Sequence, residues 1–182
     1  MLLTNTFTGK NFLLSALIAC LLIACSGPES KLAKYGPEVA NVLLTDNGAF
    51  RGLNLGDKMD SVIAKEGVPA SEADEGYLYY ELQLDSSCSY NISYNFDENG
   101  LNEIQSDIYI KDAGNTEKVF DCFKRYFDDH YGKSELHQGF TVWTVKSDKF
   151  GEVKINLSDE SSDLTVPNSP GKIAIWIYPS RE

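Results

Sequence analysis

Hydrophobic and polar residues alternate along three neighbouring stretches in the first half of the chain, "YLYYELQL" (77–84), "SYNISYNF" (89–96) and "LNEIQSDIYI" (101–110). A period of two predicts β-strands with one face toward a core. The turn "DENG" (97–100) between the last two ends in a glycine and predicts a hairpin. The side expected to face the core carries Leu78, Tyr80, Leu82, Leu84, Tyr90, Ile92, Tyr94, Phe96, Ile104, Ile108 and Ile110.

A helix is predicted before these strands, where the hydrophobic spacing changes from two residues to three or four. Asp57 is a candidate N-cap and Gly67 a candidate C-cap, with Pro69 as a stop. The apolar face of this helix is expected to carry Met59, Val62 and Ile63. Ahead of it, "PEVANVLL" (37–44) is a candidate for a further short helix.

The second half repeats this order. Thr116 is a candidate cap for a helix over "EKVFDCFKRYFDDHY", which Gly132 closes. Strands are expected at "FTVWTV", "GEVKINL" and "KIAIWIY", with a polar loop at 158–171 between the last two. The apolar face of the predicted helix over 117–131 is expected to carry Val119, Phe123, Phe127 and Tyr131. We therefore expect an α+β fold: a tandem α-β-β-β repeat over 49–113 and 114–182, forming one antiparallel sheet with helices packed on one face.

The first 24 residues contain a single charge, Lys10, and an apolar run of thirteen residues, 12–24. This run is short for a membrane-spanning helix, which needs about 20 residues, and a signal peptide is preferred to a buried helix because "SGPES" follows at once. The ending "LIAC" resembles the lipobox of bacterial lipoproteins. That resemblance implies acylation of Cys25, residues 25–48 as acylated cysteine and tether, and anchoring in the cell envelope. Cys25 is preferred to Cys20 because cleavage at Cys20 would leave an apolar tail.

Position 26 is Ser rather than Asp, which by the same resemblance favours the outer membrane, facing the periplasm. The formal charge of −11 argues against nucleic acid or anionic lipid headgroups as the main partner, because both are polyanions. A basic protein partner is compatible with this charge, and so is the simpler reading that the charge keeps the chain soluble. The partners expected are therefore the membrane, through the acyl groups, and a protein.

Two cysteines remain outside the signal region, Cys88 and Cys122. In a compartment that permits disulfides, one bridge between them is the simplest account, with two buried free thiols as the alternative. No Cys or His spacing indicates a metal site. His130 and His137 are the only histidines, no catalytic constellation stands out, and we expect neither enzymatic activity nor a cofactor.

The side of the strands that alternates away from the core is rich in Tyr, Trp, Asn and Ser, as binding surfaces are. Strand propensity alone offers a second explanation for these aromatic residues. The candidate partner-binding residues are Tyr77, Tyr79, Asn91, Asn95, Tyr109, Trp176 and Tyr178, accompanied on the same side by Glu81, Gln83, Ser93, Gln105 and Asp107.

The segment 53–82 resembles the BamE-like (SmpA/OmlA) lipoprotein repeat, through Gly56, Val62, Gly67 and Pro69 and the "DENG" hairpin that follows. A more divergent copy is seen in "FKRYFDDHYGKS" and "TVWTV", which lacks the "G-x-P" after its helix. The tandem arrangement is similar to that of the beta-lactamase inhibitory protein. The resemblance implies a non-enzymatic module that binds proteins, as an envelope assembly accessory or an inhibitor. A structural lipoprotein that binds glycan or peptidoglycan is the alternative.

Overall fold

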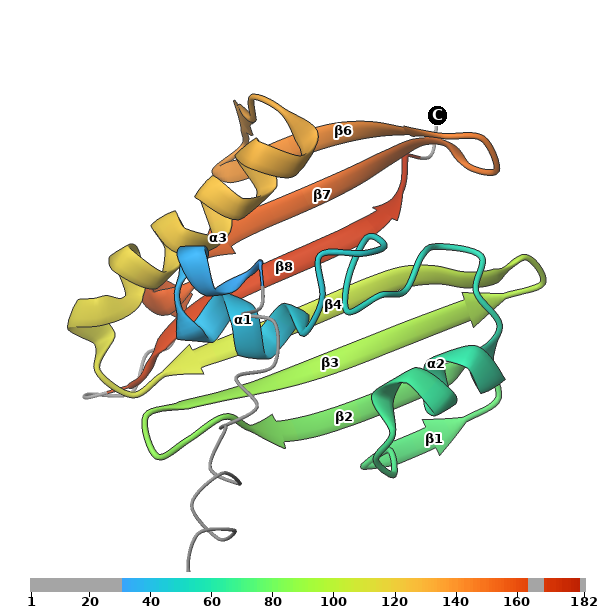
Figure 1. Ribbon diagram of the computed structural model, residues 1–182, viewed down its shortest axis with the longest axis horizontal. Helices are drawn as coiled ribbons and strands as arrows, with labels where there is room; N and C mark the ends of the chain where they lie inside the picture. Colours follow the sequence, from blue (N-terminus) through green and yellow to red (C-terminus); the bar gives the residue numbers. More distant parts are fainter. Residues whose placement is uncertain (1–30, 164–168, 181–182) are drawn as a thin grey trace, which may run out of the picture.

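The computed structural model describes residues 31–163 and 169–180 (Figure 1). The helical elements are η1 (Ala33–Tyr35), α1 (Pro37–Leu43), α2 (Met59–Glu66), η2 (Ala113–Asn115), α3 (Thr116–Tyr131) and η3 (Ser161–Asp163). The strands are β1 (Glu72–Asp74), β2 (Tyr77–Gln83), β3 (Cys88–Asp97), β4 (Gly100–Ile110), β5 (Glu135–His137), β6 (Phe140–Ser147), β7 (Gly151–Asp159) and β8 (Gly171–Pro179).

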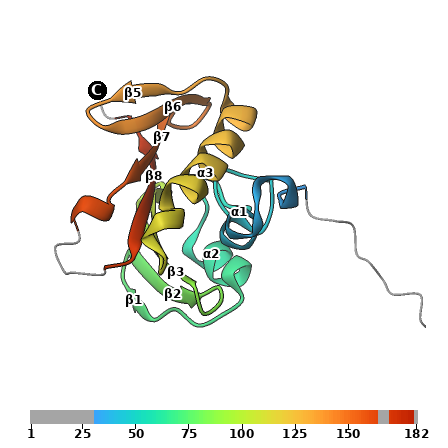
Figure 2. The same ribbon diagram turned by 90° about the vertical axis from the view of Figure 1, so that its left-hand side faces the viewer.

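The strands form one antiparallel eight-stranded sheet in the order β1-β2-β3-β4-β8-β7-β6-β5. Four strands of the first half thus meet four strands of the second half at the central β4–β8 pair. Figure 2 shows α1, α2 and α3 together on one side of the sheet. The α+β class, the antiparallel pairing and the helices on one face agree with the sequence-based expectation.

Two strands were missed by the sequence analysis, which expected three strands in each half. Both β1 and β5 are only three residues long and exposed throughout. Each lies at an edge of the sheet and pairs with one neighbour. An exposed three-residue segment has no hydrophobic alternation, so the pattern gave no signal for it.

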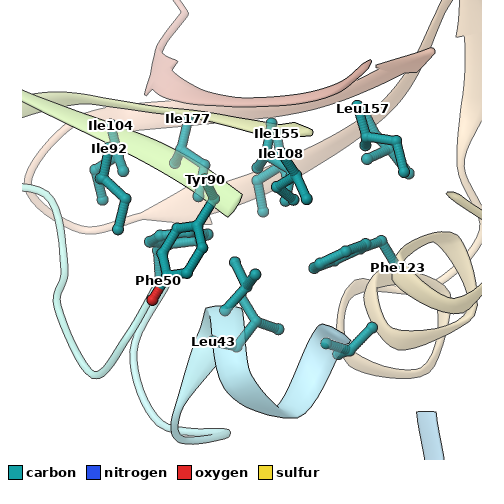
Figure 3. Close-up of a cluster of buried hydrophobic side chains, with 14 of the residues drawn as sticks. Leu43, Phe50, Tyr90, Ile92, Ile104, Ile108, Phe123, Ile155, Leu157 and Ile177 are labelled. Carbon is teal, nitrogen blue, oxygen red and sulfur yellow. The ribbon is translucent and has the colours of Figure 1, made fainter. Parts of the chain in front are cut away.

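The core lies between the sheet and the helices, as Figure 3 shows. Strand residues such as Ile92, Ile108 and Ile155 meet Leu43 of α1 and Phe123 of α3 there, and all five are at most 1% exposed. The alternation predicted for the strands therefore points the expected residues inward. Burial of this apolar face against the helices is the main source of the fold's stability.

The predicted face of α2 was wrong at one position. Val62 is fully buried, but Ile63 is 45% exposed, and Glu66 takes a buried place instead. Glu66 is accommodated because Arg51, from the preceding loop, forms a two-point ion pair with it. Hydrophobic spacing alone does not reveal a buried carboxylate whose partner is 15 residues away.

Both proposed N-caps differ from expectation. Lys58, not Asp57, occupies the N-cap of α2, and the Asp57 carboxylate accepts a hydrogen bond from the Asn54 backbone N–H at 3.0 Å. Asn115 occupies the N-cap of α3, which makes Thr116 its first helical residue. The prediction of Gly67 as the C-cap of α2 is confirmed, because its backbone has the left-handed conformation with φ of 66°.

Candidate functional site

The side of the sheet opposite α1, α2 and α3 is called the outer face below. All seven candidate partner-binding residues lie on it: Tyr77, Tyr79, Asn91, Asn95, Tyr109, Trp176 and Tyr178. Trp176 is 39% exposed and the other six are partly exposed, whereas their neighbours along the strands, such as Tyr80 and Ile177, are buried. The sequence alternation therefore brought residues from four strands onto one surface.

A single row of paired residues crosses the whole outer face and fixes the spacing of its features. From edge to edge it consists of Glu72, Tyr79, Ser93, Gln105, Trp176, Asn156, Val142 and Glu135. Tyr79 and Trp176 are three strands apart in this row. Because neighbouring strands lie about 4.8 Å apart, these two aromatic residues are about 14 Å from each other.

One aromatic pair lies on β2, where the rings of Tyr77 and Tyr79 are nearly parallel with centroids 6.5 Å apart. The Tyr79 hydroxyl donates to the Glu81 carboxylate at 3.4 Å. Burial, followed by the negative charge of Glu81, raises the pKa of Tyr79 above its usual value. Tyr79 is therefore a neutral hydrogen-bonding phenol at physiological pH, with its ring available to a partner.

The second aromatic pair lies on β8, where the ring centroids of Trp176 and Tyr178 are 5.2 Å apart. The Tyr178 hydroxyl accepts a hydrogen bond of 3.1 Å from the side-chain amide of Asn156 on β7. The sequence analysis did not select Asn156, although the alternation in "GEVKINL" places it opposite Ile155 and Leu157. The alternation of this strand is therefore enough to predict that Asn156 lies on the outer face.

A cluster of charged groups lies on the outer face to one side of the row that joins Tyr79 to Trp176. Lys172 forms ion pairs with Asp107 at 3.3 Å and with Glu160 at 2.8 Å. Burial lowers the pKa of Lys172, but the hydrogen bond to Glu160 and the charge of Asp107 outweigh it, so the pKa is raised overall. Tyr109 is paired with Lys172 in the sheet register. Burial, followed by the charge of Asp107, raises the pKa of Tyr109.

The two selected asparagines occupy different surroundings on β3. The Asn95 amide donates to the Glu103 carboxylate at 2.8 Å, so its side chain is fixed within the sheet. Asn91 lies between Glu81 and Asp107 in the register, in an acidic part of the outer face. Both asparagines therefore have carboxylates beside them, which would attract a positively charged group, although Asp107 is already paired with Lys172.

The outer face is hollowed where β8, β7 and β6 meet the β5–β6 hairpin, and this feature is called the outer hollow. Its volume is about 580 Å³. The hollow depends on the register of four strands and on the short edge strand β5, so the hydrophobic pattern gives no signal for it. Its walls include Trp176, Tyr178, Asn156, Thr144, Lys154, Phe140, Val142, Glu135 and His137.

Cys88 and Cys122 are both free thiols, so the predicted disulfide is not formed in the structure. Cys88 begins β3 and Cys122 lies on α3, and both line a cavity of about 230 Å³ together with Gly36. Burial raises the pKa of the Cys88 thiol to about 11, with smaller contributions from Glu38 and Asp85.

The residues 31–163 and 169–180 were also searched for a metal site and for a helix that could cross a membrane. Nowhere in these two ranges do three or more His, Cys, Asp or Glu side chains gather as a metal site would require. The Nδ1 atom of His130 lies 3.2 Å from the backbone oxygen of Tyr126, in the last turn of α3. Among the described residues, no helix is both long and apolar enough to cross a membrane. Cys25 lies outside the described residues.

Comparisons with known proteins found no match to any family model, to any curated protein or to any solved structure.

Proposed function

We propose that this chain is a lipid-anchored, non-enzymatic module of the bacterial cell envelope that binds a protein through the outer face of its sheet. The observation that carries the proposal is the gathering of aromatic residues, Trp176 exposed and the tyrosines partly exposed, on the side of the sheet that α1, α2 and α3 leave uncovered (Figure 2). Tyr and Trp supply large contact area at low entropic cost, and they are enriched among residues that dominate protein interfaces.

The arrangement suits a partner that contacts two places at once. Two aromatic pairs lie on β2 and β8, and the uncharged polar residues Ser93 and Gln105 lie between Tyr79 and Trp176 in the register. The charged residues Asp107 and Lys172 lie to one side of this row. Aromatic residues at the centre with charged residues at the rim are the usual composition of a specific protein contact. The formal charge of −11 and the acidic surroundings of Asn91 favour a basic partner surface.

We further propose that the two halves, 49–113 and 114–182, are tandem copies of one unit. The support is the mirrored strand order, in which β4 and β8, the last strand of each half, pair at the centre. This arrangement is the one implied by the resemblance to BamE-like repeats and to the beta-lactamase inhibitory protein. An experimental structure tests it: β2, β3 and β4 should superpose on β6, β7 and β8 with α2 over α3, and another correspondence would contradict the repeat.

The anchor is proposed at Cys25, because the signal-like segment ends there. The full chain should incorporate labelled fatty acid, and Cys25→Ser should abolish incorporation and leave uncleaved precursor. Cys20→Ser is the matched control and should change neither. If Cys20→Ser alone removes the label, the anchor is at the other cysteine.

The protein-binding proposal is tested by affinity capture from envelopes solubilised in detergent. The full chain should retain one protein at a fixed stoichiometric ratio, and Tyr79→Ala should lose most of it, because truncating an interface anchor typically costs about 2 kcal/mol or more. Ser162→Ala, an exposed position on η3, is the control and should retain the partner. Retention of the chain on isolated cell wall, without any stoichiometric protein, would instead support the glycan-binding alternative.

A further inference from the structure

The outer hollow contains a polar side chain that is buried without all its hydrogen bonds. Asn156 is 8% exposed, and its amide nitrogen donates to the Tyr178 hydroxyl at 3.1 Å. Its Oδ1 atom has no hydrogen-bond partner. A buried acceptor left unpaired is costly, so a group that donates a hydrogen bond would be favoured here.

Aromatic and polar side chains line the hollow together. Trp176 and Phe140 provide apolar surfaces, whereas Thr144, Tyr178 and Asn156 provide hydroxyl and amide groups. Thr144 and Tyr178 already accept hydrogen bonds from Lys154 and Asn156, but a purely apolar ligand would leave the Asn156 Oδ1 atom unpaired. An occupant with an apolar face and several hydroxyl groups matches both kinds of surface.

Charge within the hollow favours a neutral occupant. The lining includes one acidic side chain, Glu135, and one basic side chain, Lys154, so their formal charges sum to zero. Lys154 is already engaged, since its amine donates to Thr144 Oγ1 at 2.7 Å and lies 3.9 Å from Glu152. It therefore does not offer an isolated positive charge to an anion. The volume of about 580 Å³ falls within the range of about 300–1,000 Å³ usual for small-ligand sites.

We propose that the outer hollow binds a neutral sugar ring of a glycan, which stacks on Trp176 and exchanges hydrogen bonds between its hydroxyls and the Asn156 amide. A pyranose ring combines an apolar face with hydroxyls that donate and accept, is uncharged, and fits the volume. This site goes beyond the protein-binding function proposed above and does not depend on it, because its support is the unpaired Asn156 and the composition of the hollow.

The test is a titration of the full chain with two neutral oligosaccharides, chitotriose and maltotriose, in a detergent without a sugar headgroup. Tryptophan fluorescence is a suitable signal, because Trp143 is 1% exposed and Trp176 is the exposed tryptophan. At least one sugar should shift the emission. Trp176→Ala and Asn156→Ala, measured by calorimetry, should each bind about tenfold more weakly or worse, while melting curves verify that both variants are folded.

Tyr79→Ala is the matched control, since Tyr79 lies on the outer face three strands away from Trp176. It should bind the sugar normally even though it loses the protein partner, so failure of one proposal is distinguishable from failure of the other. The sugar site is ruled out if neither oligosaccharide binds the folded chain at millimolar concentration. Equal sugar affinity in the native chain and in folded Trp176→Ala would also overturn it. If the two hollow variants lose only a captured protein, the hollow belongs to the protein contact.

Discussion

Arg51 and Glu66 form an ion pair that is almost fully enclosed, with side chains 5% and 1% exposed. Two Arg51 nitrogens donate to the carboxylate at 2.8 and 2.7 Å, and a third donates to the Val42 carbonyl at 2.7 Å. The Tyr94 hydroxyl donates to the same carboxylate. Arg51 has φ of 54°, an unusual conformation for a residue with a side chain, which these bonds help to hold.

Glu66→Gln should therefore destabilise the fold strongly. It leaves the Arg51 guanidinium buried without its counter-charge, and loss of one partner from a buried pair costs about 3–5 kcal/mol. The free energy of unfolding in urea measures the change. Glu152→Gln is the control, because that carboxylate is 56% exposed and 3.9 Å from Lys154, and it should leave stability nearly unchanged. Equal effects of the two substitutions would show that the enclosed pair is not structural.

The two thiols should react at different rates. Cys88 is 4% exposed and its pKa is raised to about 11 by burial, so at neutral pH it is a protonated, covered thiol. Cys122 is partly exposed on α3. Iodoacetamide at neutral pH should modify Cys122 first and Cys88 only after denaturation, as peptide mass spectrometry can measure. A native peptide pair that joins Cys88 to Cys122 through a disulfide would contradict the free-thiol state.

At the level of elements, the junction between β8 and α3 depends on the absence of a side chain at Gly171. A Cβ atom there would lie 1.7 Å from Thr116 Oγ1 and 2.8 Å from Thr116 Cβ, at the first turn of α3. Real atoms do not approach so closely, so β8 or α3 would have to move. Close packing of the last strand under the long helix thus requires glycine at this position.

Gly171→Ala should destabilise the fold by about 1–3 kcal/mol, the usual cost of overpacking. Adding Thr116→Ala should recover part of that loss, because the hydroxyl is the closest obstacle. Gly114→Ala is the control, since its Cβ would meet only the Asp112 carboxylate, at 3.3 Å. Urea unfolding of the native chain, Gly171→Ala, Thr116→Ala and the double variant forms a mutant cycle. Full stability of Gly171→Ala would show that the junction is looser than described.

The elements were predictable where burial is periodic and were missed where it is not. Ile92, Ile108 and Ile155 all face the core, as the alternation of their strands indicated. Glu66 was not foreseen as buried, because its burial depends on Arg51 and on the Tyr94 hydroxyl rather than on local pattern. The edge strands β1 and β5 carry no buried residue and therefore no period.

For the whole molecule, the sequence indicated which residues share the outer face but not how they are arranged across it. The alternation of inward and outward positions along each strand was enough to predict that Tyr79 and Trp176 lie on the same side of the sheet. Their separation of about 14 Å follows from the strand order, in which β8 pairs with β4, and that order is set by contacts far apart in the chain. The outer hollow was unpredictable for the same reason, because Asn156 and His137 meet there only through tertiary register.

The central claim is that the outer face is a contact surface and not part of the core. Its most direct test is the melting temperature and the partner capture of one variant, Tyr79→Ala with Trp176→Ala. Both side chains lie outside the core, so the melting temperature should stay near that of the native chain while capture is lost. Ile92→Ala, at a fully buried position, is the reference and should lose about 2–5 kcal/mol of stability. A fall in melting temperature comparable with that of Ile92→Ala, or undiminished capture by the folded double variant, would contradict the account.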